Sequence, residues 1–201
     1  SADVVIGGAI SDTATVSGGH TPTGTVTFRL YGPNDASCAT AIFTSANRPL
    51  TGGSATSAEF TPPAVGTYRW IATYNGDANN NSVAGKCDDA NESVVVSKTT
   101  PSINTNLVSG AESGATISVA LGATVHDTSS LSGTTADAGG TVHYQVFTNA
   151  NCTGTAIDAG TKAVTSGIPA DSDPVTFNNA GNYYWQADYS GDAKNGSATS
   201  N

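Results

Sequence analysis

"GTYRWIATYNGDANN", residues 66–80, decides the fold, because the chain repeats it as "GNYYWQADYSGDAKN" at residues 181–195. The offset between the two copies is 181 − 66 = 115 residues. In a chain of 201 residues, an internal repeat of this period predicts two domains of ordinary size rather than one large domain. We therefore expect one module at residues 1–98 and a second at residues 99–201.

Two further segments extend the repeat. "ISDTATVSG" at residues 10–18 matches "VHDTSSLSG" at residues 125–133 with the same offset, and "GTVTFRLY" at residues 24–31 matches "GTVHYQVF" at residues 140–147 with an offset of 116. The offset between the copies is constant within each segment and changes only between segments. Surface loops are expected there, because loops tolerate insertions that strands do not. The repeat unit is therefore expected to be a domain with fixed strands and variable loops.

Alternation within the repeated stretch indicates half-buried strands. Tyr68 and Trp70 share one face of the first copy, as Tyr183 and Trp185 do in the second, and the residues between them differ between copies. A period of two with one constant face identifies the side turned toward a core. Short strands of this kind, separated by Gly, Pro and Asn-Gly turns, predict an all-β fold built from sandwiches.

The aromatic strand carries a more specific pattern. Each copy opens with Gly-x-Tyr, which resembles the tyrosine corner of immunoglobulin-like sandwiches, and the Trp two residues later adds bulk to the core. Together with "PTGTVTFRLYG" at residues 22–32 and the "YNGDANN" and "YSGDAKN" turns, this makes the chain similar to the bacterial Ig-like domain repeats of large actinobacterial surface proteins. The resemblance implies two tandem immunoglobulin-like β-sandwich modules joined by a short linker. It also implies an extracellular stalk or adhesive array, and no catalytic residues.

Composition excludes several function classes. The formal net charge of −9 argues against binding to nucleic acid, which needs clusters of Lys and Arg. No apolar run in the sequence has the length of a membrane span. His20, His126 and His143 lack ligand spacing, and the chain has neither a nucleophile elbow nor a phosphate-binding glycine loop. The sequence therefore predicts neither an enzyme nor a cofactor.

These expectations leave three candidate functions. The first is a structural spacer in a secreted or cell-surface protein, whose partners are neighbouring Ig-like repeats. The second is an adhesive module that binds a host or cell-surface glycan or protein, and the third is an accessory domain of a secreted enzyme. All three place the chain outside the cell.

The best candidate for a metal site is an acidic cluster. It comprises Asp77, Asp88, Asp89 and Glu92, whose oxygens could bind calcium. The spacing does not match a known calcium loop, and Asp beside Gly also caps turns. Turn capping and calcium binding are therefore both open.

The best candidate for a binding surface lies on the second module. Phe147 and Tyr184 are expected to point outward from neighbouring strands, with His143 and Gln186 beside them. Aromatic rings rimmed by amides can stack on sugars, although exposed apolar residues are also ordinary on protein surfaces. Both interpretations stay open.

Asp12 and Asp127 are expected to point inward, because they alternate with the outward residues of their strands. A buried carboxylate needs partners. One alternative is an intramolecular isopeptide crosslink, which needs a Lys in the same core. The other is an acid that accepts hydrogen bonds from backbone amides.

The three cysteines predict one disulfide and one free thiol. Cys38 and Cys87 belong to the first module and are expected to form a bond. Cys152 matches Cys38, but the position that matches Cys87 lies one residue beyond Asn201, so Cys152 is expected to be unpaired. The same alignment predicts that the first module lacks its first strand and the second its closing strand. The sheet edge beside residues 183–189 is then expected to be open or filled by another chain.

Overall fold

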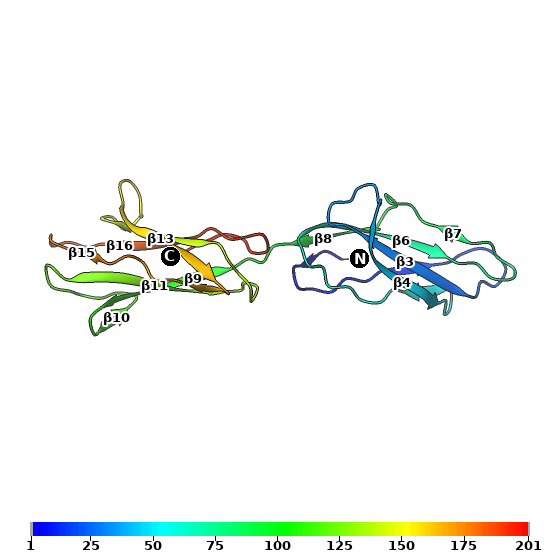
Figure 1. The fold of residues 1–201 in the computed structure, drawn as a ribbon, viewed down its shortest axis with the longest axis horizontal. Coiled ribbons are helices and arrows are strands. Elements are labelled where there is room, and N and C mark those ends of the chain that lie inside the picture. The colour runs from blue at the N-terminus through cyan, green and yellow to red at the C-terminus, as the bar shows by residue number, and fades with distance from the viewer. Residues whose placement is uncertain (1, 201) are drawn as a thin grey trace. The chain divides into compact units, whose positions relative to one another are not determined.

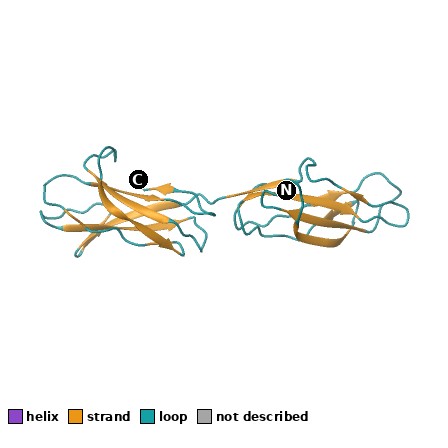
Figure 2. Cartoon of the chain, turned by 45° about the horizontal axis from the view of Figure 1, so that its top comes forward, coloured by secondary structure: helices purple, strands orange, loops and turns teal. Residues whose placement is uncertain are grey.

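The computed structural model describes residues 2–200, and these residues form strands and loops without a helix (Figures 1 and 2). The chain divides into two compact units, Ser1–Lys98 and Thr99–Asn201, called unit 1 and unit 2 below. Within the described residues there is no helical segment with the length and hydropathy needed to cross a bilayer. The fold is all-β, and each unit builds its own sheets and its own core.

Unit 1 contains a larger and a smaller sheet. The larger has the order β1-β8-β6-β3-β4, with β7 also paired to β6, and the smaller pairs β2 with β5. The strands are β1 (Val4–Val5), β2 (Thr13–Thr15), β3 (Thr25–Tyr31), β4 (Ala41–Pro49), β5 (Ser54–Thr56), β6 (Gly66–Tyr74), β7 (Val83–Ala84) and β8 (Ser93–Ser97). Residues of both sheets contribute to one apolar core, an arrangement consistent with a β-sandwich.

Unit 2 also contains two sheets. Their orders are β10-β9-β11-β15 and β14-β13-β12-β16-β17. The strands are β9 (Ser102–Ser109), β10 (Glu112–Gly114), β11 (Thr124–Ser132), β12 (Thr141–Phe147), β13 (Ile157–Thr165), β14 (Ile168–Pro169), β15 (Val175–Thr176), β16 (Tyr184–Tyr189) and β17 (Ala198–Thr199). Side chains from both sheets again share one core.

The aromatic strands β6 and β16 are interior strands of these sheets. β6 pairs with β3 through residues 69–74, and β16 pairs with β12 through the counterpart residues 184–189. Tyr68 and Trp70 on β6 are 0% and 1% exposed, so the face that alternation assigned to the core of unit 1 is buried. Tyr183 and Trp185 also pack against the core of unit 2, but both stay partly exposed.

One strand-face prediction is wrong. Phe147 was expected at the surface, yet it is only 5% exposed, and its counterpart on β3, Tyr31, is 9% exposed. Neither belongs to the apolar core cluster of its unit. Alternation gives the face of the sheet on which a side chain lies, but it does not show whether other residues cover that face.

The edge of β16 differs from the expected open edge. β17 pairs with Asp188 and Tyr189, and Ser200 donates its backbone N–H to the carbonyl of Ala187. Residues 183–186 have no strand on that side within the described part of the chain. The open portion of the edge is therefore shorter than predicted.

Candidate functional site

The cysteines occupy equivalent loops of the two units. Cys38 follows β3 and is bonded to Cys87, which follows β7, with a Cα–Cα distance of 5.7 Å. Cys152 follows β12 and carries a free, half-buried thiol. Cys38 and Cys152 both have a φ of 49°, an uncommon value for a residue other than Gly. The two loops thus share a local backbone conformation, although only one of them is crosslinked.

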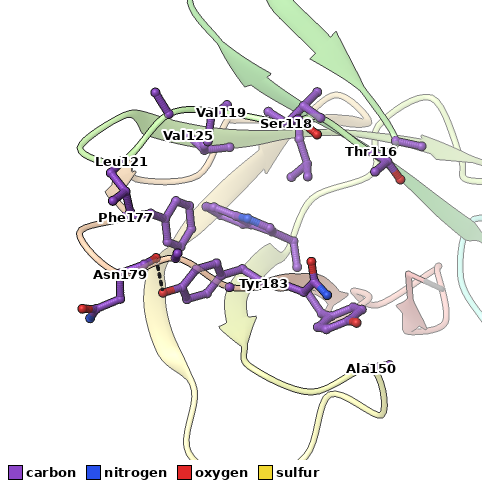
Figure 3. Close-up of a pocket in the computed structure, with 18 of the residues that line it drawn as sticks. Thr116, Ser118, Val119, Leu121, Val125, Ala150, Phe177, Asn179 and Tyr183 are labelled. Carbon is purple, nitrogen blue, oxygen red and sulfur yellow. Dashed lines mark hydrogen bonds between the residues drawn. The ribbon is translucent and has the colours of Figure 1, made fainter.

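The two tyrosines at the start of the aromatic strands make the same local bond. The hydroxyl of Tyr68 donates to the carbonyl of Ala64 at 2.8 Å, and that of Tyr183 donates to the carbonyl of Asn179 at 3.1 Å (Figure 3). In both units the acceptor lies four residues upstream, which is the geometry of a tyrosine corner. These hydroxyls therefore fix the loop that leads into each aromatic strand.

We expect Tyr68→Phe to lower the free energy of unfolding of unit 1 by about 1 kcal/mol, because it leaves a carbonyl unpaired beside a fully buried ring. Tyr183→Phe is the matched control. Its ring is partly exposed, so water can replace the lost donor and the loss is expected to be smaller. Urea denaturation of both variants measures the difference, and equal losses would contradict this account.

The "GDANN" turn clamps two loops of unit 1 together. The Asp77 carboxylate accepts hydrogen bonds from the backbone N–H of Thr23 at 2.7 Å, the hydroxyl of Tyr74 at 2.9 Å and the N–H of Asn79 at 2.8 Å. The Asn80 side chain both accepts from the N–H of His20 and donates to its carbonyl. The hydrogen bond from Thr23 contributes most to holding the Asp77 pKa well below its usual range.

The "GDAKN" turn of unit 2 does the same. Asp192 accepts from the N–H groups of Gly139 and Lys194, and Asn195 bonds to Thr135 through both its amide nitrogen and its oxygen. Burial opposes ionisation of Asp192, but these donors together lower its pKa to about 2. Both copies share an Asp-x-x-Asn spacing in this turn. This spacing is the feature of the sequence from which the clamp could have been predicted.

The proposed acidic cluster is not brought together. Asp77 sits in the clamp, Asp89 accepts from the N–H of Lys86, and the backbone carbonyl of Glu92 bonds to the N–H of Trp70. Within residues 2–200, no group of three or more His, Cys, Asp or Glu side chains has the geometry of a metal site. For Asp77, the capping role is the one that the contacts describe.

We expect millimolar calcium to leave the melting temperature of the chain unchanged, because protein donors already occupy the Asp77 carboxylate. Differential scanning calorimetry with calcium and with EDTA checks this. Magnesium at equal ionic strength controls for screening. A rise in melting temperature that Asp77→Asn abolishes would restore the calcium site.

A pair of carboxyl groups is buried in unit 1. Asp12 is 7% exposed, and its carboxyl lies within hydrogen-bonding reach of that of Glu92. Asp12 Oδ2 and Glu92 Oε2 have no hydrogen-bond partner within the described residues. Burial, and then the charge of Asp12, raise the pKa of Glu92 to about 7. Two carboxyl groups this close are not both ionised without a cost, so the folded chain binds a proton at this pair more tightly than the unfolded chain does.

Asp127 is the counterpart of Asp12 in unit 2 and is 0% exposed. Its carboxylate accepts from the N–H of Asn106 at 3.1 Å, while burial raises its pKa to about 7. In both units the Asp backbone N–H also donates to a serine, Ser57 or Ser172, at 3.0 and 2.8 Å. These serines are again related by the repeat offset, 172 − 57 = 115, which sequence reasoning did not use.

Two of the four lysines are paired with acids other than Asp12 and Asp127. Lys162 and Lys194 form ion pairs with Asp173 and Asp137, each at 2.6 Å. The hydrogen bonds to Asp12 and Asp127 that involve backbone groups are those expected of an acid held by amides at a strand.

The predicted aromatic patch is only partly assembled. On β12 and β16, Phe147 registers with Tyr184 and His143 with Asp188. Tyr184 and Gln186 are half-buried, and His143 Nε2 lies 3.2 Å from the Asp158 carboxylate. Because Phe147 is buried, the patch offers one aromatic ring to a ligand rather than two.

Unit 2 contains a groove of about 690 Å³. One wall carries Val119 and Leu121, and the other carries Phe177 and Tyr183 (Figure 3). Trp185 and Cys152 also line it. Apolar and aromatic side chains therefore line the groove together with Thr, Ser and Asn side chains, and the groove borders residues 181–185, beside the open portion of the β16 edge.

Comparison with known proteins does not indicate a role for these residues. No protein-family model matches the chain, and no curated protein matches it in sequence. A functional conclusion must therefore rest on the residues of the chain itself.

Proposed function

We propose that the chain is a pair of immunoglobulin-like modules that act as a structural spacer in a secreted or cell-surface protein. The observation that carries this proposal is the use of the repeated polar residues. The tyrosine corners and the Asp-x-x-Asn clamps all bond within their own unit and hold loops in place. Residues that recur in both modules thus serve rigidity, which a spacer requires.

The immunoglobulin-like assignment is supported by two features shared by the units. Each has two sheets around one core, and each has a tyrosine corner at the start of its aromatic strand. The Lys98–Pro101 segment joins the modules, and Pro101 favours extended backbone at the residue before it. Neighbouring modules of the same kind are the partners that this proposal implies.

An extracellular location is supported by the disulfide. Cys38–Cys87 would be reduced in most cytosols and persists in oxidising compartments. The low fraction of charged residues, 11%, and the net charge of −9 are compatible with a surface that does not bind nucleic acid.

Small-angle X-ray scattering of the full chain tests the spacer. Each module should measure roughly 40 Å, given strands of about eight to ten residues at ~3.3 Å each and end loops. The expected result is a pair-distance distribution with a shoulder from the separation of two modules. Replacing Pro101 by Gly is expected to broaden that shoulder, whereas a single compact peak for the parent chain would contradict a spacer.

A second candidate, a glycan-binding module, is favoured by one observation. Tyr184 and Gln186 share a face of β16 and remain partly exposed. A glycan array probed with the full chain and with Tyr184→Ala tests this. Binding that the variant loses would support a lectin-like role, and binding equal in both would not.

A further inference from the structure

The groove in unit 2 corresponds to a filled position in unit 1. In unit 1, β8 runs antiparallel to β6 and pairs Val96 with Gly66, Val95 with Thr67 and Val94 with Tyr68. Val94 and Val96 are 0% and 1% exposed, and both belong to the apolar core. The residues of unit 2 that match this stretch of β6 are residues 181–184, which border the groove. β8 thus shows what kind of element fits the groove.

The aromatic strand is shorter where this neighbour is not present. β6 begins at Gly66, whereas β16 begins at Tyr184, the counterpart of Arg69. Residues 66–68 pair with β8 and lie beyond the stretch of β6 that pairs with β3. The counterpart residues 181–183 therefore present backbone donors and acceptors that a partner strand could pair.

The opposite wall of the groove also corresponds to a segment of unit 1 that contacts β8. In unit 1, β1 pairs in parallel with β8, and the next residue, Ile6, is 9% exposed in the core. The counterparts in unit 2 are Val119 and Leu121, which are 38% and 64% exposed and line the groove. Ile6 is thus buried in unit 1, whereas its counterpart Leu121 is open in unit 2.

Two polar features of the groove region also match the β8 segment. Cys152, which lines the groove, is the counterpart of Cys38, and Cys38 is bonded to Cys87, seven residues before Val94. Asp127 is the counterpart of Asp12, whose carboxyl meets Glu92, two residues before Val94. Asp127 Oδ2 has no hydrogen-bond partner within the described residues.

We propose that the groove is a strand-acceptor site, which binds an extended polypeptide segment with the side-chain pattern of residues 87–97. The segment lies antiparallel to β16 and parallel to residues 119–121. It places β-branched residues at the positions of Val94 and Val96 in the groove. It also carries a cysteine seven residues before the first of these, opposite Cys152. This mode of recognition adds a strand to an exposed edge and reads alternate side chains in pockets. The proposal does not depend on the spacer function.

A synthetic peptide with the sequence of residues 87–98, CDDANESVVVSK, is the probe. Its cysteine is prepared as a mixed disulfide with 2-thiopyridine and is mixed with the full chain, in which Cys152 is the free thiol. The Cys152 thiolate attacks the peptide sulfur, a protein–peptide disulfide forms, and pyridine-2-thione leaves. Release of the thione reports the rate, and intact mass reports the product.

We expect the peptide to react roughly tenfold faster, or more, than the same peptide with both Val94 and Val96 replaced by Asp, because docking raises the local concentration of the disulfide. Leu121→Asp in the protein is expected to remove this advantage. Ile168→Asp is the matched control, since Ile168 is 72% exposed and does not line the groove. Equal rates for the two peptides would overturn the proposal.

A second measurement does not use the thiol. In Cys152→Ser, the unmodified peptide is expected to protect the backbone amides of residues 181–186 from hydrogen exchange. Absence of this protection would overturn the proposal. It would also be overturned if light scattering showed a dimer in which those amides are already protected, because the occupant would then be a second copy of this chain.

Discussion

Replacing Cys38 and Cys87 together by Ala is expected to lower the free energy of unfolding of unit 1 by about 4 kcal/mol. The disulfide joins residues 49 positions apart, and opening a loop of that length restores conformational entropy to the unfolded chain. Unit 2 contains no disulfide within the described residues, so its stability should not change. A loss of this size is a large fraction of the stability of an ordinary domain.

The two tryptophans make this measurable unit by unit. Trp70 is in unit 1 and Trp185 is in unit 2, and the chain has no others. In a Trp185→Phe background, urea denaturation followed by Trp70 emission reports unit 1 alone. Cys152 forms no disulfide, so Cys152→Ala opens no loop. Its effect on the free energy of unfolding should stay within about 0.5 kcal/mol. If the double replacement also changed unit 1 by no more than that, the disulfide would not constrain the unfolded state.

The core residues of the aromatic strand could be predicted from periodicity, because successive side chains of a pleated strand point to opposite faces of the sheet. Tyr68 and Trp70 were assigned to the core by alternation, and both are buried. The disulfide between Cys38 and Cys87 was predicted from their place in the repeat and is present. Such predictions depend on local geometry and on repeat offsets, both of which are written in the sequence.

Contacts between residues that lie far apart in the sequence could not be predicted in this way. Glu92 was grouped with the acids near it in the chain, but the folded chain brings its carboxyl close to that of Asp12, eighty residues away. The buried carboxyl pair therefore depends on how distant segments pack. The prediction that Phe147 is exposed was wrong for a related reason. Whether the outer face of a sheet is covered depends on neighbouring residues that alternation cannot identify.

The buried carboxyl groups give the chain an unusual pH dependence. Burial holds the pKa of Asp127 at about 7, against 3.8 for an unperturbed aspartate, and that of Glu92 at about 7, against 4.5. Both groups bind protons more tightly in the folded chain. Their contribution is fully present below the unfolded pKa values, near pH 4, and is lost as the pH rises through 7.

The clamps have the opposite dependence. The pKa of Asp192 is lowered to about 2, and that of Asp77 is lowered as well, so their contributions are lost when the pH falls below the unfolded value of 3.8. Stability is therefore expected to be greatest near pH 4 to 5. It should decline in both directions from that range.

At pH 8, Asp127→Asn is expected to stabilise unit 2, although the substitution introduces an amide into its core. One pKa unit corresponds to about 1.4 kcal/mol, so ionising the buried Asp127 costs on the order of 4 kcal/mol. An amide has nearly the same shape and does not ionise. The parent chain should therefore lose melting temperature between pH 5 and pH 8, and the variant should lose less.

Glu92→Gln provides the same comparison in unit 1, where the amide can donate a hydrogen bond to the Asp12 carboxyl and does not ionise. Asp173→Asn is the control, because it replaces an exposed carboxylate that is paired with Lys162 outside the core. Hydrogen exchange across this range assigns each change to its unit. If Asp127→Asn destabilised unit 2 equally at pH 5 and pH 8, Asp127 would be ionised in the folded chain throughout. Its buried oxygen without a partner would then need another donor.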